Sequence, residues 1–135
     1  MKTFFSVLFV LFLTNFYVSA QAPAKNARFV KEHVKMNISV EKAKTYMYNA
    51  TDYVILDVRT PEEFSQGNIK NSVNIDYNAP DFVEKISALD KNKTYMVYCR
   101  SGARSSKAVE IMNTNGFHYL MHIDGGFLAW QKLQN

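Results

Sequence analysis

The sequence predicts a single α/β domain with a central, mostly parallel sheet flanked by helices. Short apolar runs alternate along the chain with stretches whose apolar residues recur every three or four positions, the pattern of successive βα units. Two of the short runs, 53–58 and 94–99, have apolar residues at consecutive positions, which is typical of strands covered on both faces. The 135-residue chain is long enough for one domain, and no internal repeat or linker divides it.

The first half of the predicted domain takes its element boundaries from caps and turn residues. Ser39 is a good N-cap for a helix whose apolar residues follow at helical spacing. After the strand 53–58, Thr60 is expected to cap a short helix that has Pro61 at its first position. Gly67 is expected to end that helix.

The second half of the domain repeats the alternation of strands and helices. Apolar residues on one face mark each helix, and β-branched or aromatic residues mark each strand. The expected elements are a strand at 72–75, a helix starting at Pro80 or Asp81, a strand at 94–99, a helix from 103 that ends before Gly116, a strand at 119–123 and a terminal helix led by the glycines 125–126.

Residues 1–20 are predicted to be a secretory signal peptide rather than part of the fold. Lys2 precedes an apolar run over 4–13, and small residues before position 21 suit cleavage near Ala20. This run is about half the ~20 residues that a membrane-spanning helix needs, so no stable membrane anchor is expected. The protein is therefore predicted to be exported, into a periplasm or out of the cell.

The mature chain is expected to begin with residues 21–36 as a tail or short helix, the helix covering 27–35. The folded domain is expected to span 37–133. The full chain has a net charge of +4 without a basic block, which does not favour nucleic acid as a partner.

Cys99 is the only cysteine, and it lies where a predicted strand ends and a predicted helix begins. A lone thiol is unusual in an exported protein, and a small buried hydrophobe is the ordinary interpretation. Its neighbours argue against that role. The first helical turn presents unpaired N–H groups, Arg100 and Arg104 add positive charge, and Gly102 permits a tight turn. Together they should lower the thiol pKa from ~8.5.

The three histidines are expected to be surface or strand-end residues. His33, His118 and His122 show no metal-ligand spacing with Cys99, so we predict neither a metal nor a cofactor. Activation of the thiol by a helix terminus and arginines requires no general base.

Three segments resemble the single-domain rhodaneses, a family of sulfurtransferases. They are YVILDVRTPEEFSQGNI at 53–69, CRSGARS at 99–105 and DGGFLAWQ at 124–131. They lie in the order expected of the family, and the resemblance covers about 37–133. The resemblance implies a three-layer rhodanese-like domain. Two positions depart from the family pattern, with Asn68 in place of histidine and Asn71 in place of glycine, and Asn71 can still adopt a left-handed turn.

The resemblance also implies a reaction. Cys99 would take the outer sulfur of a small anionic donor such as thiosulfate and pass it, as a persulfide, to cyanide or a thiol. Arg104 would bind the donor or orient the loop by pairing with Asp57. Arg59 and Glu63 are expected to act in ion pairs or backbone hydrogen bonds. The implied loop residues are Arg100, Ser101, Gly102, Ala103 and Arg104, supported by Asp57, Arg59 and Ser105.

The length of the loop favours sulfur over phosphate. Four residues lie between Cys99 and Arg104, and the related phosphatases have one residue more, which makes a wider cradle. Phosphatase or arsenate reductase chemistry is therefore disfavoured. A sulfur-carrier or redox-sensing module that serves a protein partner stays open as an alternative. A non-catalytic interaction domain would usually lack the cysteine.

Overall fold

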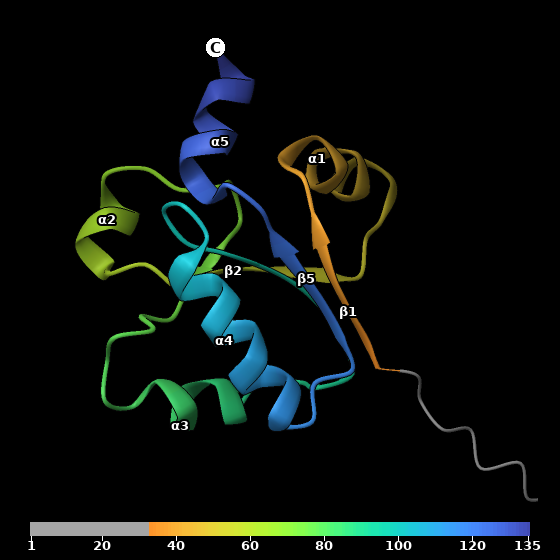
Figure 1. Ribbon diagram of the computed structural model, residues 1–135, viewed down its shortest axis with the longest axis vertical. Helices are drawn as coiled ribbons and strands as arrows, with labels where there is room; N and C mark the ends of the chain where they lie inside the picture. Colours follow the sequence, from red (N-terminus) through yellow and green to blue (C-terminus); the bar gives the residue numbers. More distant parts are fainter. Residues whose placement is uncertain (1–32) are drawn as a thin grey trace, which may run out of the picture. The chain divides into compact units, whose positions relative to one another are not determined.

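The structure, a computed structural model, describes residues 33–135. The predicted signal peptide and most of the predicted tail lie outside these residues. Strands and helices alternate through the described part of the chain, as predicted (Figure 1). The elements are β1 (Val34–Ile38), α1 (Val40–Asn49), β2 (Tyr53–Asp57), α2 (Pro61–Ser65), β3 (Val73–Asn74), α3 (Phe82–Ser87), β4 (Thr94–Tyr98), α4 (Ala103–Thr114), β5 (Tyr119–Ile123) and α5 (Gly126–Gln134).

The strands form one sheet in the order β1-β5-β4-β2-β3, and every neighbouring pair is parallel. The predicted parallel sheet is therefore confirmed. From β2 the chain moves outward to β3, whereas from β4 it moves the other way to β5. The order thus reverses between β2 and β4, and in open α/β sheets ligands bind beyond the carboxyl ends of strands at such a point.

The N-terminal strand β1 corrects the last two residues of the short helix predicted over 27–35. Val34 and Lys35 belong to a strand that pairs with β5, with Val34 opposite Tyr119, and residues 27–32 lie outside the described part. Helical spacing of apolar residues was outweighed because pairing with the edge of β5 satisfies the backbone groups of β1 and buries Ile38 in the core. The sheet also begins three residues before the predicted domain start at 37.

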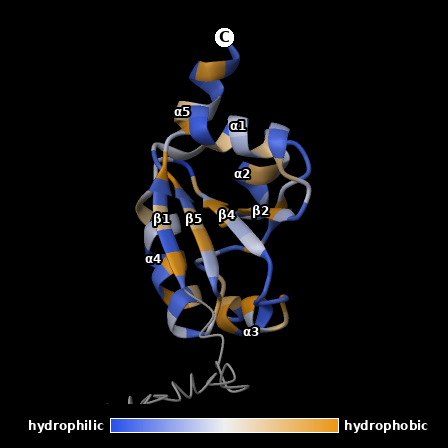
Figure 2. Cartoon of the chain, turned by 90° about the vertical axis from the view of Figure 1, so that its right-hand side faces the viewer, coloured by the Kyte–Doolittle hydropathy of each residue, from blue (hydrophilic) through white to orange (hydrophobic). Residues whose placement is uncertain are grey.

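Helices cover both faces of the sheet. Leu56 and Val97 face a core shared with α3 and α4, whereas Ile55 and Met96 face a second core shared with α1 and α5. Figure 2 shows apolar residues gathered along the strands between these helices. Adjacent strand residues thus point to opposite, equally buried faces, as the consecutive apolar runs predicted.

Local signals in the segment after β2 are confirmed. Thr60 caps α2 through a reciprocal pair of hydrogen bonds with Glu63, and Pro61 is the first helical residue. Asn71 adopts φ 66°, the left-handed turn expected of it. Within residues 33–135 no helix combines the length and apolar character needed to cross a membrane.

Candidate active site

The thiol of Cys99 lies at the carboxyl end of the central strand β4, in a loop that leads directly into α4. The residue is 1% exposed. Its Sγ accepts hydrogen bonds from the N–H of Gly102 at 3.1 Å and from the hydroxyl of Ser105 at 3.4 Å. Two of the predicted loop and supporting residues therefore touch the sulfur.

The surroundings of the sulfur lower its pKa. Burial alone raises the pKa of Cys99, because a thiolate loses solvation there. The Ser105 hydroxyl and the backbone N–H groups of Ser105, Gly102 and Ser101 outweigh this effect, and the pKa falls below its ordinary value. The direction agrees with the prediction, and hydrogen bonding to the charged form is the cause.

Gly102 allows the loop to turn into α4. Its φ is 118°, a conformation that side chains with a Cβ rarely adopt, and α4 begins at the next residue. This turn brings the Gly102 N–H back onto the sulfur. The helix therefore starts beside the thiol, with first-turn N–H groups that have no partner within the helix.

The predicted pairing of Arg104 with Asp57 is wrong. Arg104 instead binds Glu63 through two hydrogen bonds, from Nη1 to Oε2 at 2.7 Å and from Nη2 to Oε1 at 2.8 Å. The Arg104 hydrogen bonds lower the pKa of Glu63 to about 2. The α2 cap orients Glu63, because its carboxylate accepts from the Thr60 N–H and from Arg104 at the same time.

Asp57 is occupied by Arg59, which confirms the ion pair expected for that arginine. Arg59 donates from Nη2 to Asp57 Oδ2 at 2.6 Å, and both side chains are almost fully buried. The same nitrogen donates to the Gly67 carbonyl at 2.7 Å, and the guanidinium lies 4.2 Å from the ring centre of Phe127. This pair joins the end of β2 to α5.

The first residues of α5, which follow the turn at Gly125, hold the cysteine loop through backbone hydrogen bonds. The N–H of Phe127 donates to the Cys99 carbonyl at 2.8 Å, and that of Leu128 to the Arg100 carbonyl at 3.1 Å. A Cβ on Gly126 would collide with the Cys99 carbonyl oxygen, so only glycine fits there. The glycines expected to lead the terminal helix do so, and they also bring the start of α5 against the cysteine loop.

His122 is the residue that the sequence interpretation missed. Its side chain is buried, and its Nε2 lies 2.8 Å from the Ser105 hydroxyl and 3.2 Å from the Gly102 carbonyl. One signal was available. His122 lies near the end of β5, the strand beside β4, and the carboxyl ends of parallel strands share one edge.

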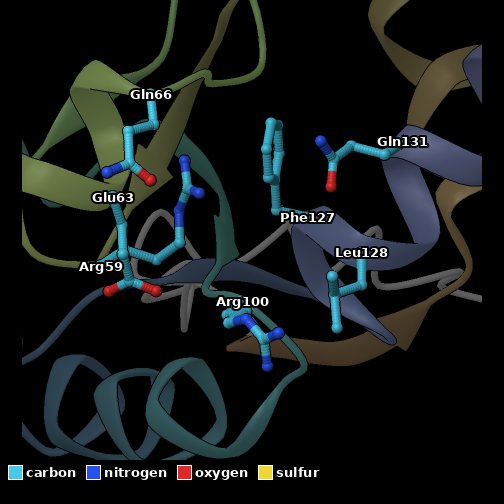
Figure 3. Close-up of a pocket in the computed structure, with 7 residues that line it drawn as sticks. All are labelled: Arg59, Glu63, Gln66, Arg100, Phe127, Leu128 and Gln131. Carbon is cyan, nitrogen blue, oxygen red and sulfur yellow. The ribbon is translucent and has the colours of Figure 1, made fainter.

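A pocket of about 250 Å³ adjoins the loop. Figure 3 shows residues from the segment after β2 on one side and residues from α5 on the other. Arg100 of the cysteine loop reaches this pocket, is exposed, and has no ion pair with any described residue. The lining residues are Arg59, Glu63, Gln66, Arg100, Phe127, Leu128 and Gln131.

The described part of the chain contains no cluster of side chains that could bind a metal ion. Among residues 33–135 no group of three or more His, Cys, Asp or Glu side chains is placed to hold an ion. The chemistry that these residues offer is that of a thiolate held by backbone N–H groups, beside an exposed arginine.

A buried cysteine in an anion-binding loop, at the carboxyl end of a central parallel strand, defines a class of α/β domains that use a thiolate. Comparison with known families places the chain within it. The rhodanese-like domain family matches residues 39–133, and the protein belongs to that family.

Individual relatives agree on the fold. Thiosulfate sulfurtransferase 16, chloroplastic, of Arabidopsis thaliana is 36% identical over 112 residues, which cover 76% of this chain and 92% of that protein. The solved structure of a rhodanese-related protein from Thermoplasma volcanium has a TM-score of 0.65 and 32% identity, covering 73% of this chain and 92% of that one.

One relative carries out a different reaction. The tRNA uridine(34) hydroxylase of Cytophaga hutchinsonii is 38% identical over 87 residues, which cover 62% of this chain but 28% of that protein. The domain therefore also occurs within a larger enzyme that is named for another activity. Family membership gives the fold and the sulfurtransferase class, but the substrates depend on the residues of the site.

Proposed function

We propose that the protein moves a sulfane sulfur from thiosulfate, or from a related persulfide donor, to cyanide or a thiol through a persulfide on Cys99. The observation that carries this proposal is the hydrogen bond from the Gly102 N–H to the Cys99 sulfur, inside a loop with four residues between Cys99 and Arg104. A loop of this length suits a single sulfur atom better than a tetrahedral phosphate.

In the first step the Cys99 thiolate attacks the outer sulfur of thiosulfate. A new S–S bond forms to Cys99, the S–S bond of thiosulfate breaks, and sulfite leaves with that electron pair. The negative charge now rests on the outer sulfur of the persulfide. The N–H groups of the loop and of the first turn of α4 stabilise it there.

In the second step an acceptor takes the outer sulfur. Cyanide or a thiolate attacks it, the S–S bond to Cys99 breaks, and the thiolate of Cys99 is restored with thiocyanate or a new persulfide as product. The acceptor thiol belongs to a small molecule or to a protein. No step needs an external oxidant or reductant.

Arg100 is the residue that receives the anionic donor. Arg59 and Arg104 are both engaged by carboxylates, so their charges are largely neutralised. Arg100 is exposed at the pocket and leaves its positive charge available. A charged group at the mouth of a site attracts a small anion of opposite sign and raises its local concentration.

Export is the second part of the proposal. Residues 1–20 combine a basic start, an apolar run and small residues near Ala20, which supports cleavage there and delivery to a periplasm or to the outside. In such a compartment the single thiol has no second cysteine in the chain with which to form an internal disulfide.

The test is the intact mass of the protein expressed from its full gene and recovered from the exported fraction. After reduction, desalting and exposure to thiosulfate, the mass should rise by about 32 Da, one sulfur atom, and cyanide should reverse this rise. The measured mass should also correspond to a chain that has lost residues 1–20. Cys99→Ser is the matched control and should gain nothing. A wild-type protein that gains no sulfur would contradict the sulfurtransferase proposal. A protein that retains residues 1–20 would contradict the proposal of export with cleavage.

A further inference from the structure

Behind the cysteine loop, away from the pocket that Arg100 lines, a chain of polar groups leads from the sulfur to His122. The Ser105 hydroxyl lies 3.4 Å from Cys99 Sγ and 2.8 Å from His122 Nε2, and Ser105 is fully buried. On the far side of the ring, His122 Nδ1 lies 3.3 Å from Asp124 Oδ1. We propose that His122 receives the thiol proton of Cys99 through the hydroxyl of Ser105.

The hydroxyl of Ser105 has one proton and three acceptors within reach, which are Cys99 Sγ, His122 Nε2 and the Gly102 carbonyl at 3.1 Å. The first two of these acceptors lie on the proposed path. When the sulfur is a thiol, S–H donates to the Ser105 oxygen and the Ser105 O–H donates to the lone pair on His122 Nε2. When the sulfur is a thiolate, Nε2 carries a proton and the Ser105 O–H donates to the sulfur. The two arrangements differ by the transfer of one proton along the chain.

When the proposed first step starts from the neutral thiol, it releases one proton, and this chain of polar groups can accept it. Reaction of a thiol with thiosulfate gives a persulfide anion, sulfite and one proton. The S–H bond of Cys99 breaks, its proton moves to the Ser105 oxygen, and the proton of Ser105 moves to His122 Nε2. The electron pair stays on the sulfur and forms the new S–S bond.

The charges around His122 favour this direction of transfer. Asp124 at the end of β5 faces Nδ1 and stabilises an imidazolium ring. Lys35 on β1 and Glu110 on α4 also approach His122, but they pair with each other at 2.6 Å and largely cancel. On the Ser105 side lies Cys99, whose thiolate attracts the protonated ring.

A second pocket gives the proton an exit. It has a volume of about 230 Å³ and is lined by His122 together with polar residues of β1 and α4, among them Asn37 and Ser106. The substrate pocket at Arg100 is lined by a separate set of residues. Sulfur therefore enters at one side of the loop, and the proton leaves at the other.

His122 acts through Ser105, so it is a positioning residue for the proton and does not touch the substrate. This inference rests on the proposed function for its chemical use, because persulfide formation is the step that releases the proton. Its physical content can be tested without any sulfur donor. Cys99 is the only thiol in the chain, so the thiolate absorbance near 240 nm reports this site alone once the Cys99→Ser spectrum is subtracted.

The decisive variant is His122→Gln, whose amide can still donate to the Gly102 carbonyl but cannot accept a proton at neutral pH. We expect its thiolate fraction to fall about tenfold at any pH below the midpoint of the thiol titration. Ser105→Ala should lose more, because it also removes the hydroxyl that donates to the sulfur. The double variant should lose no more than Ser105→Ala alone, because both changes interrupt one chain. His33→Gln is the matched control and should titrate like the wild type, since His33 is an exposed residue that precedes β1.

The rate of persulfide formation separates a proton acceptor from a purely structural residue. With thiosulfate, His122→Gln should be about tenfold slower near pH 6 and should recover at high pH, where the thiol ionises unaided. A structural defect would slow the reaction equally at every pH. Thermal unfolding of each variant checks that the fold is retained, and His122→Asn provides the same test if His122→Gln does not fold.

The outcomes also separate this inference from the proposed function. Identical thiolate titrations in the wild type and His122→Gln, or additive losses in the double variant, overturn the relay even if the wild type forms a persulfide. A lowered thiolate fraction in a protein that never forms a persulfide would leave the relay standing and overturn the sulfurtransferase proposal.

Discussion

Two arginine–carboxylate pairs flank the cysteine loop, and they differ in their access to water. In the pair of Asp57 and Arg59 the side chains are 0% and 4% exposed, whereas in the pair of Glu63 and Arg104 they are 27% and 23% exposed. Removing one member of a buried pair leaves the other charge without solvent or a counter-charge. In a partly exposed pair, water can solvate the charge that remains. The pair of Asp57 and Arg59 should therefore govern the stability of the fold. The pair of Glu63 and Arg104 should govern the position of the cysteine loop.

The strongest test of this comparison is Asp57→Asn. The change leaves the Arg59 guanidinium buried without its counter-charge, and breaking such a pair typically costs about 3–5 kcal/mol. Urea unfolding should report this loss in the free energy of unfolding. The matched variant Glu63→Gln should lose no more than about 1 kcal/mol, because its pair is partly solvated. Equal losses in the two variants would remove the distinction.

A smaller effect is expected from Arg104→Lys, on activity rather than on stability. Lysine keeps the charge but cannot make two parallel hydrogen bonds to Glu63, so the end of the loop is held less firmly. Thiocyanate formation from thiosulfate and cyanide should fall about tenfold, equivalent to about 1.4 kcal/mol. Unfolding should stay close to wild type. In contrast, Arg59→Lys should lower stability first, and an unchanged rate in Arg104→Lys would count against a positioning role.

The smallest expected effect is the pH dependence of the stability that the partly exposed pair of Glu63 and Arg104 contributes. The pKa of Glu63 falls from its ordinary value of 4.5 to about 2 in the folded protein, chiefly through the Arg104 hydrogen bonds. A lowered folded-state pKa stabilises the fold above the ordinary value, and this contribution is lost as the pH drops from about 4.5 towards 2. Glu63→Gln should therefore lose less stability than wild type over this range, by about 1 kcal/mol or less given the solvent exposure. Parallel acid-unfolding curves for the two proteins would contradict this role.

Local signals in the sequence were sufficient for much of the fold. Thr60 and Pro61 begin α2 as predicted, because capping depends on residues within one turn of each other. The buried strands at 53–58 and 94–99 were evident from their consecutive apolar residues. The strand β1 was missed because its stability comes from pairing with β5, for example of Val34 with Tyr119, 85 positions further along the chain. Helical spacing of apolar residues carries no information on such a distant partner.

The candidate site shows the same division. The cysteine at a strand end, the glycine that turns the loop and the start of α4 are neighbours in the chain, so the sequence by itself determined the thiolate cradle. The partner of Arg104 and the burial of His122 against Ser105 were decided only by the tertiary structure. These contacts join segments 41 and 17 residues apart. Their distances are set by how parallel strands and their helices pack at one edge of the sheet, and no local pattern of residues encodes that packing.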